Sequence, residues 1–227
     1  MEESARMKTC GWATSDPLLK EYHDKEWGVP LHEDVKLFEF LILEGAQAGL
    51  NWLTVLKKRE NYSRAFDSFD PAKVARYSGI DTRRLLSDPG IIRNRLKIAA
   101  AITNAHKFLD VQENFGSFDN YIWQFTGGRP IKHHFRSMSQ VPAKSRESDA
   151  MSEGLYRRGF KFVGSTICYA FMQAVGMVND HTVNCFRYKQ TSVQASAGQI
   201  SMPKFIPLPC SRLEDVKLMP LRAKIPH

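Results

Sequence analysis

The chain has 227 residues with 43% hydrophobic residues and a formal net charge of +8, an ordinary composition for a globular protein whose length favours one sizeable core over two very small domains. No apolar run approaches the roughly 20 residues of a membrane span, and the acidic first residues lead us to expect no secretory signal. Four widely spaced cysteines indicate a reducing cytoplasm rather than a disulfide framework. We therefore expect a cytoplasmic protein without a membrane partner.

Residues 10–30 are rich in aromatic and metal-ligating side chains. Ser15-Asp16-Pro17 predicts a helix start, because serine or aspartate caps a helix and proline is tolerated in its first turn. The helix is expected to end at Trp27-Gly28-Val29-Pro30. The side chains that matter below are Cys10, Trp12, Tyr22, His23 and Trp27.

Asp34–Glu60 is predicted to be helical, as two helices or one interrupted helix, because Gly45 and Gly49 weaken its middle. Steps of three and four residues define a seam of Leu37, Leu41, Glu44, Ala48, Trp52 and Val55. Glu44 stands out there, since an ionised and unpaired carboxylate is costly to bury. It is either a helix-end carboxylate that reaches solvent or caps the backbone, or part of a site. The nearby aromatic residues favour the site.

The middle of the chain predicts short helices separated by turns. Further helical patterns cover Pro71–Tyr77, Asp81–Leu86, Ile91–Leu109 and Phe118–Phe125. Residues 131–146 predict a connecting loop, with His133 and His134 on its surface. No alternating strand pattern is convincing, so the predicted class is all-α.

A glycine-bracketed turn, Gly159 to Gly164, separates a helical pattern at Ser152–Arg158 from an apolar run at Ile167–Val175. This is the layout of a helix-hairpin-helix, in which backbone N–H groups at the second helix can bind a phosphate. Gly159, Lys161 and Gly164 are therefore candidate DNA contacts. Lys161 could alternatively be a Schiff-base nucleophile, but a phosphate-facing or solvated lysine is the favoured interpretation.

Cysteine and histidine pairs occur near both ends of the body. Cys10 and His23 are followed, after a long interval, by His181 and Cys185, which would share one face of a helix. Each pair alone is typical of a buried thiol and a core histidine. Together they make a Cys2His2 set with no position left for water, which predicts one structural zinc joining the two ends. Cys168 is expected in the core.

The chain divides into a single domain over residues 1–188 and a basic tail over residues 189–227. The tail contains several serines and prolines without a helical period, so we expect it to be disordered.

Six segments closely resemble the bacterial 3-methyladenine DNA glycosylase I family, in one collinear order. They are C-G-W (10–12), Y-H-D-K-E-W-G-V-P (22–30), L-E-G-A-Q-A-G-L-N-W-L-T-V-L-K-K-R-E-N-Y (43–62), D-P-G-I-I-R-N-R-L-K-I (88–98), R-G-F-K-F-V-G-S-T-I-C-Y-A-F-M-Q-A (158–174) and V-N-D-H-T-V-N-C (178–185). The resemblance implies a helix-hairpin-helix DNA glycosylase fold with zinc held by the four cysteines and histidines. It implies excision of 3-methyladenine from alkylated double-stranded DNA.

The resemblance also assigns roles. Glu44 falls on the family's active-site glutamate, and Tyr22 and Trp52 on residues that line the base pocket, whereas Leu19 replaces an aromatic residue of the family member compared. Trp12 and Trp27 are added as aromatic faces that would favour a cationic methylated base. Such a base is a good leaving group, so we expect simple hydrolysis without a lyase step. We also expect the protein to be a monomer.

Three further expectations and two alternatives complete the prediction. Gln47 follows Glu44 closely and is our candidate for the DNA gap left by the flipped base. Asp180 is expected to orient the zinc ligand His181 rather than to take part in the reaction. The alternatives are a zinc-stabilised, non-catalytic DNA-binding module and a bifunctional glycosylase/lyase that uses a reactive lysine.

Overall fold

The computed structural model describes residues 8–191, so residues 1–7 and most of the tail predicted for residues 189–227 lie outside the described residues. The α-helices are α1 (Pro17–Lys25), α2 (Asp34–Gln47), α3 (Trp52–Leu56), α4 (Arg59–Ala65), α5 (Pro71–Val74), α6 (Gly79–Ser87), α7 (Arg95–Phe115), α8 (Phe118–Trp123), α9 (Arg146–Arg157) and α10 (Ser165–Ala174). The 3-10 helices are η1 (Gly11–Thr14), η2 (Asp67–Phe69), η3 (Gln124–Thr126) and η4 (Met138–Gln140). The strands are β1 (Ile131–Lys132) and β2 (Val178–Asn179). The predicted helical class is confirmed.

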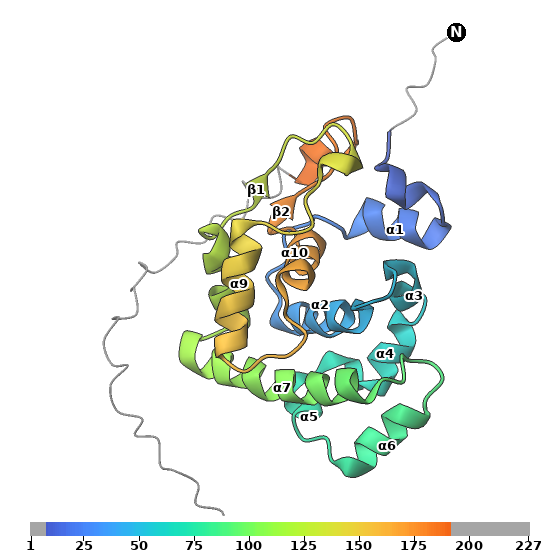
Figure 1. The fold of residues 1–227 in the computed structure, drawn as a ribbon, viewed down its shortest axis with the longest axis vertical. Helices are drawn as coiled ribbons and strands as arrows, with labels where there is room; N and C mark the ends of the chain where they lie inside the picture. The colour runs from blue at the N-terminus through green and yellow to red at the C-terminus, as the bar shows by residue number, and fades with distance from the viewer. Residues whose placement is uncertain (1–7, 192–227) are drawn as a thin grey trace, which may run out of the picture.

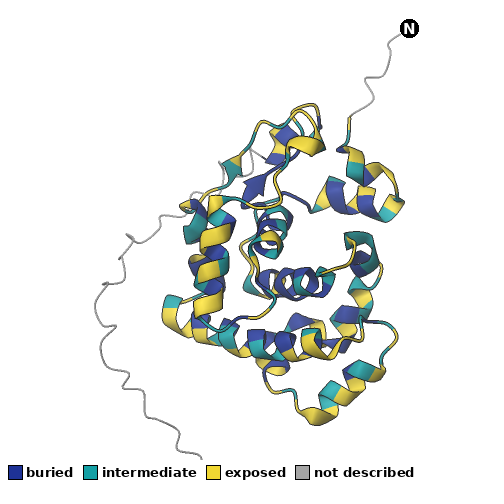
Figure 2. Cartoon of the chain, in the orientation of Figure 1, coloured by how far each residue is buried: buried dark blue, intermediate teal, exposed yellow. Residues whose placement is uncertain are grey.

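Helix α2 is the centre of the fold. Its sequence, D-V-K-L-F-E-F-L-I-L-E-G-A-Q, is apolar on nearly every side, and such a helix is stable only when other elements surround it. Figure 1 shows α2 between α7 and α10, with α3 and α4 beside one end. Figure 2 shows that α2 is buried along most of its length, whereas the peripheral α6 is largely exposed. Each large apolar side chain buried here contributes about 1.5–3 kcal/mol.

The break predicted within Asp34–Glu60 occurs after Gln47. Gly45 stays within α2, and the chain turns at Gly49, whose φ of +76° lies in the left-handed region that glycine adopts without strain. Asn51 then caps α3 by accepting a hydrogen bond from the Thr54 backbone N–H at 2.9 Å. The predicted segment therefore contains three helices rather than two.

Capping side chains set several helix starts that hydrophobic periodicity misplaced. The helix predicted from Ile91 begins at Arg95, because the Asn94 side chain accepts hydrogen bonds from the backbone N–H groups that follow it. Similarly, α9 begins at Arg146, earlier than the predicted Ser152, because Ser145 and Ser148 form a reciprocal capping box. At α1 the prediction is confirmed, since Asp16 caps the helix.

The segment after α1, Gly28 to Leu31, crosses the C-terminal end of α10. The Gly28 N–H donates to the Gln173 carbonyl at 3.0 Å, and the Leu31 N–H donates to the Val175 carbonyl at 3.1 Å. Gly176, with a φ of +72°, lies against this segment so closely that an added Cβ would be 2.4 Å from the Pro30 nitrogen. This crossing places α1 next to the residues that follow α10 (Figure 1).

Two short features depart from the predicted loops. Strand β1 lies within the predicted loop 131–146 and pairs in parallel with β2, with Ile131 opposite Val178. At the C-terminal side, residues 187–191 are helical, and Thr191 is only 2% exposed. The packed body therefore continues past the predicted boundary at residue 188.

Candidate functional site

An aromatic pocket opens between α1, the end of α2, α3 and α10. Its empty volume, including the open mouth, is about 580 Å³. The lining residues are Trp12, Tyr22, Trp27, Glu44, Gln47, Trp52, Met138, Ala170 and Gln173. All four predicted base-binding aromatic residues, together with Glu44 and Gln47, are thus brought into one pocket from two parts of the sequence.

The aromatic walls are held by contacts among themselves. The Tyr22 and Trp52 ring centroids lie 5.3 Å apart, and those of Trp12 and Trp27 lie 5.1 Å apart at 74°, close to an edge-to-face arrangement. Tyr22 also contacts Phe40 of α2. These contacts link α1 to α2 and α3 and fix the orientation of the rings that face the pocket.

Helix α2 carries two buried carboxylates with opposite environments. Glu39 is paired with Arg59, whose Nε donates at 2.7 Å, and with Lys36, whose Nζ donates at 2.9 Å. Glu44 is 4% exposed, and its Oε2 has no hydrogen-bond partner among residues 8–191. Burial raises the pKa of Glu44 to about 8, so its carboxyl group is mostly protonated near pH 7. Because the protonated carboxyl group is uncharged, the cost of burying an ionised Glu44 that we expected from the sequence does not arise.

Two further polar atoms of the same pocket lack a protein partner. Trp12 Nε1 and Trp52 Nε1 are buried without a hydrogen-bond acceptor in the described part of the chain. Since buried polar groups are nearly always paired, several unpaired ones around one cavity indicate a polar ligand. The pocket is thus lined by the Glu44 residue and by flat apolar faces, with two unpaired indole N–H groups among its wall residues.

The turn between α9 and α10 is fixed from α7. The buried Asn104 side chain accepts from the Lys161 N–H at 2.7 Å and donates to the Lys161 carbonyl at 2.9 Å. Gly159 has a φ of +88°, and Gly164 is the N-cap residue of α10 without any side-chain cap. The Lys161 side chain is exposed and, within the described chain, does not line the aromatic pocket. This placement argues against a Schiff-base role.

The four predicted metal ligands form one buried cluster. Cys10, His23, His181 and Cys185 have their potential ligand atoms within 4.8 Å of one another. His181 Nδ1 lies 3.1 Å from His23 Nε2, and Cys185 Sγ lies 3.4 Å from the same nitrogen. Cys10 Sγ is 3.7 Å from His181 Nδ1. The segment from His181 to Cys185 is a turn rather than a helix, but it still brings both side chains to one side.

The two histidines of this cluster are oriented by groups that the sequence did not indicate. His23 Nδ1 lies 2.8 Å from Asp24 Oδ1, and His181 Nε2 lies 3.0 Å from the Trp27 carbonyl oxygen. The prediction that Asp180 orients His181 is wrong. Asp180 contacts other side chains instead, because the turn after β2 directs its carboxylate towards α10.

Asp180 is the acceptor of a separate buried network. Its Oδ2 accepts hydrogen bonds from the Tyr169 hydroxyl and from Gln173 Nε2, both at 2.7 Å. Its Oδ1 lies 2.6 Å from His133 Nδ1, and the Asp180 carboxylate raises the pKa of His133. His133, predicted to lie on the surface, is partly buried and engaged with Asp180. Sequence alone could not pair residues that lie so far apart.

Residues 12–188 match the sequence model of the methyladenine glycosylase family. The chain belongs to this family. The glycosylase is 52% identical over 182 residues to DNA-3-methyladenine glycosylase 1 of Escherichia coli (strain K12), a match that covers 80% of this chain and 97% of the relative. A relative from Haemophilus influenzae is 44% identical and covers 78% of this chain and 95% of its own length. The family resemblance drawn from the sequence motifs is confirmed.

Solved structures give the same result. The crystal structure of a 3-methyladenine DNA glycosylase I matches with a TM-score of 0.77 and 50% identity, and covers 79% of this chain and 98% of that one. A tyrosine-to-phenylalanine variant of another 3-methyladenine DNA glycosylase I, solved in complex with 3-methyladenine, matches with a TM-score of 0.77 and 35% identity, over 79% and 97% of the two chains. The glycosylase therefore shares the helical architecture of its family.

Several pocket residues of the glycosylase were not predicted. Met138, Ala170 and Gln173 line the pocket but come from η4, which lies in the predicted loop, and from α10. Gln173 could have been noticed as an amide at the end of an apolar helical run, by the argument that singled out Glu44. Leu19 belongs to the core and is not among the lining residues in the described chain.

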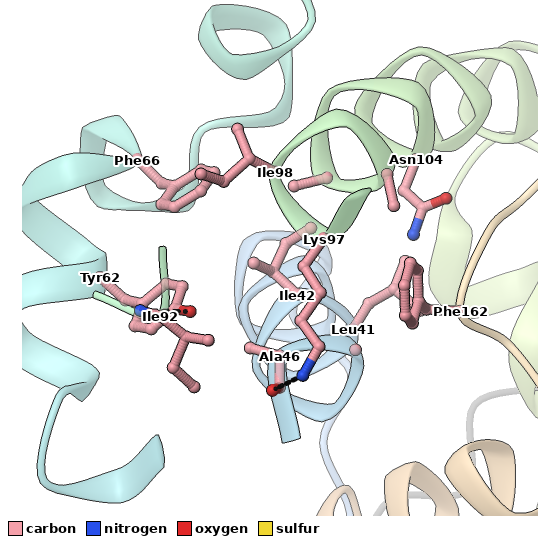
Figure 3. A pocket seen from close by; sticks show the side chains of 13 residues that line it. Leu41, Ile42, Ala46, Tyr62, Phe66, Ile92, Lys97, Ile98, Asn104 and Phe162 are labelled. Carbon is pink, nitrogen blue, oxygen red and sulfur yellow. Dashed lines mark hydrogen bonds between the residues drawn. The ribbon is translucent and has the colours of Figure 1, made fainter. Parts of the chain in front are cut away.

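A second, apolar cavity lies on the other side of α2 (Figure 3). Its polar groups are already engaged: the Lys97 amine donates to the Ala46 and Ala48 carbonyls at 2.7 and 2.6 Å and so caps the C-terminal end of α2. Figure 3 also shows Phe162, from the turn before α10, facing the same cavity. We interpret this cavity as a packing feature that supports the helix carrying Glu44.

Replacing Glu44 with glutamine should change how the stability of the glycosylase depends on pH. The folded-state pKa of about 8 exceeds the ordinary value of 4.5, so the contribution of Glu44 is fully present below pH 4.5 and is lost as the pH rises through 8. Glu44→Gln should therefore gain stability relative to wild type, by on the order of 3 kcal/mol between roughly pH 5 and pH 8. Urea unfolding at both values measures this difference, and parallel pH profiles would refute it.

No helix in residues 8–191 is long and apolar enough to cross a membrane.

Proposed function

We propose that this glycosylase flips 3-methyladenine out of alkylated double-stranded DNA and hydrolyses its glycosidic bond, acting as a monomer with water as the nucleophile. The observation that carries the proposal is Glu44, buried in an aromatic pocket with an unpaired carboxyl oxygen. The family match and a solved relative that contains 3-methyladenine support the same substrate. A base inside a duplex is inaccessible, so it must leave the stack before it reaches such a pocket.

The pocket suits a flat cation. The methylated adenine carries a positive charge while it is attached to the sugar, and the faces of Tyr22 and Trp52 attract such a ring by roughly 0.5–2 kcal/mol per well-placed contact. A cation beside Glu44 also favours the ionised carboxylate, which can then accept a charge-assisted hydrogen bond from the exocyclic amine. Binding thus compensates for the burial that keeps Glu44 neutral in the free protein.

The residues favour a simple hydrolysis. Because the cationic base is already a good leaving group, the reaction needs no strong general acid. Both oxygens of Asp180 are engaged with Tyr169, Gln173 and His133, which is unlike a carboxylate that is available to activate water. Lys161 is outside the pocket, so the bifunctional glycosylase/lyase is the less favoured alternative.

We propose that Cys10, His23, His181 and Cys185 hold one zinc ion with a structural role. In a tetrahedral site with Zn–S of about 2.3 Å and Zn–N of about 2.0–2.1 Å, neighbouring ligand atoms lie about 3.3–3.8 Å apart. Four of the six separations in the cluster are 3.1, 3.4, 3.6 and 3.7 Å, close to these edges, and all six are within 4.8 Å. Two thiols and two imidazoles are also a donor set that zinc prefers, and four protein ligands leave no open position.

We also propose that the turn from Gly159 to Gly164 works as a helix-hairpin-helix that binds the DNA backbone. Helix α10 has no side-chain cap, so its first N–H groups are available to a phosphate, and the helix dipole favours an anion there. Asn104 holds the turn rigid through Lys161, whose exposed amine adds positive charge. Gln47, beside Glu44 in the pocket, remains our candidate for the DNA gap.

The decisive experiment is single-turnover release of free base from methylated duplex DNA, with strand nicking scored in parallel. We expect wild-type protein to release 3-methyladenine without nicking. Glu44→Gln should slow release by roughly 10- to 100-fold, because it removes a charge-assisted hydrogen bond of about 1.5–3 kcal/mol. Absence of release by wild type would favour the non-catalytic DNA-binding module. Nicking, with borohydride trapping at Lys161, would establish the lyase alternative.

Gly164→Val tests the role of the turn. Gly164 has a φ of −61°, and no atom lies within 4 Å of an added Cβ, so the fold should accept the substitution. A side chain at this position should nevertheless keep a phosphate away, and binding to damaged and undamaged duplexes should weaken equally, by about tenfold. Gly79→Val, at the start of α6, is the matched control. Unchanged binding with slower release would contradict this role.

A further inference from the structure

Gln173 of α10 places an amide in the wall of the aromatic pocket. Its Nε2 donates to Asp180 Oδ2 at 2.7 Å. An ionised carboxylate can only accept hydrogen bonds, so the amide nitrogen, not the oxygen, must face Asp180. No group in residues 8–191 donates a hydrogen bond to Gln173 Oε1. The amide oxygen is therefore the polar atom that Gln173 offers to the pocket.

The orientation of Gln173 is supported from a second layer of residues. Asp180 is 1% exposed, and its carboxylate is held by the Tyr169 hydroxyl at 2.7 Å and by His133 at 2.6 Å. The backbone of Gln173 is also fixed, because its carbonyl accepts from the Gly28 N–H at 3.0 Å. The backbone and the amide group of Gln173 are consequently both held in place before any ligand enters.

We infer that Gln173 determines which methylated purines the pocket accepts, by taking a hydrogen bond from the exocyclic amine through Oε1, and that Asp180 is its positioning residue. This inference rests on the proposed function. The exocyclic amine of adenine has two hydrogens, and Gln173 Oε1 supplies an acceptor for one of them whatever the protonation state of Glu44. A purine with an oxygen at that place presents lone pairs to Gln173 Oε1 and binds more weakly.

The test compares two free bases that differ at this group. The probes are 3-methyladenine and 3-methylhypoxanthine, in which oxygen replaces the amine, and binding is followed through the fluorescence of the pocket tryptophans. Gln173→Met keeps the length of the side chain and removes the amide. Gln112→Met is the matched control, because Gln112 also donates its amide to a carboxylate, that of Asp34 at 2.6 Å, but does not line the pocket.

Wild type should prefer 3-methyladenine by at least about tenfold, since a site built to bind a substrate N–H rejects the analogue that lacks it. Gln173→Met should reduce this preference roughly tenfold, and Gln112→Met should leave it unchanged. If wild type neither binds nor releases 3-methyladenine, the proposed function fails. If wild type does both and Gln173→Met retains the full preference, the proposed function stands and the inference about Gln173 is overturned.

The positioning role of Asp180 is tested by Asp180→Asn, alone and combined with Gln173→Met. Asparagine can present either oxygen or nitrogen to Gln173, so the preference should fall severalfold in the single variant. No further fall should occur in the double variant, because Asp180 acts through Gln173. An equal fall in both backgrounds would overturn this role. Tyr169→Phe removes one hydrogen bond to Asp180 and leaves Asp180 itself, which is next to His181, unchanged. It should lower the preference for 3-methyladenine by less than Asp180→Asn does, and only when Gln173 is present.

Discussion

Replacing Cys185 with alanine should abolish binding of the proposed zinc ion and lower the melting temperature in the same variant. The remaining three ligands would surround a buried, incomplete site, and metal binding in such sites contributes folding free energy directly. We expect a loss of several kcal/mol, comparable with the loss of a native metal or disulfide. His23→Ala should behave alike, because its nitrogen belongs to the same cluster. Metal content by mass spectrometry and thermal unfolding are measured on the same samples.

Cys168→Ala is the matched control for this experiment. Cys168 is also a buried thiol, but its Sγ donates to the Val163 carbonyl at 3.2 Å and is not part of the metal cluster. Its replacement should cost only the packing of one small side chain and leave the metal content unchanged. A Cys185→Ala protein that has lost the metal but retains full stability and activity would refute the structural assignment.

Gly176→Ala should be the most damaging glycine substitution in the described chain. The φ of +72° already disfavours a side chain, and the added Cβ would lie 2.4 Å from both the Val29 carbonyl carbon and the Pro30 nitrogen. These are backbone atoms of the crossing segment and cannot rotate away. We expect a loss above about 3 kcal/mol, measured by urea unfolding, together with weaker metal binding as α1 is pushed from the body.

Gly127→Ala separates backbone strain from collision. Gly127 has a similar φ of +68°, but nothing lies within 4 Å of an added Cβ. Its replacement should therefore cost only about 1 kcal/mol, the usual cost of a side chain in the left-handed region. Equal losses in the two variants would show that the crossing tolerates displacement, contrary to the close contact described here.

The sequence predicted best the features that depend on residue type and local period. Glu44 was found because a carboxylate interrupts an apolar seam, and Cys10 and His23 because few residues bind zinc. The helix predicted from Ile91 was placed too early, because its periodicity does not show that the Asn94 side chain caps the following turn. Local side-chain chemistry overrode the hydrophobic pattern there.

The contacts between distant segments were beyond sequence reasoning. His133 and Asp180 meet only because β1 pairs with β2, and two residues per strand give too weak a signal to predict that pairing. Gln173 is conspicuous in sequence as an amide after an apolar run, but its place in the pocket depends on the contact of α10 with Gly28. A single sequence indicates which side chains are chemically unusual, but tertiary packing decides their neighbours.

The contact between N-terminal and C-terminal segments also sets the point in synthesis at which the protein can complete its metal cluster and its pocket. His23 and Cys185 are 162 residues apart in sequence and meet in the metal cluster. At about 5–20 residues per second, the ribosome needs roughly 10–30 s to add that interval. The pocket that Trp12, Tyr22 and Trp27 line also needs Ala170 and Gln173 of α10, which are synthesised only shortly before Cys185. A partly translated chain therefore has no complete base pocket, and activity begins only after nearly the whole body has left the ribosome.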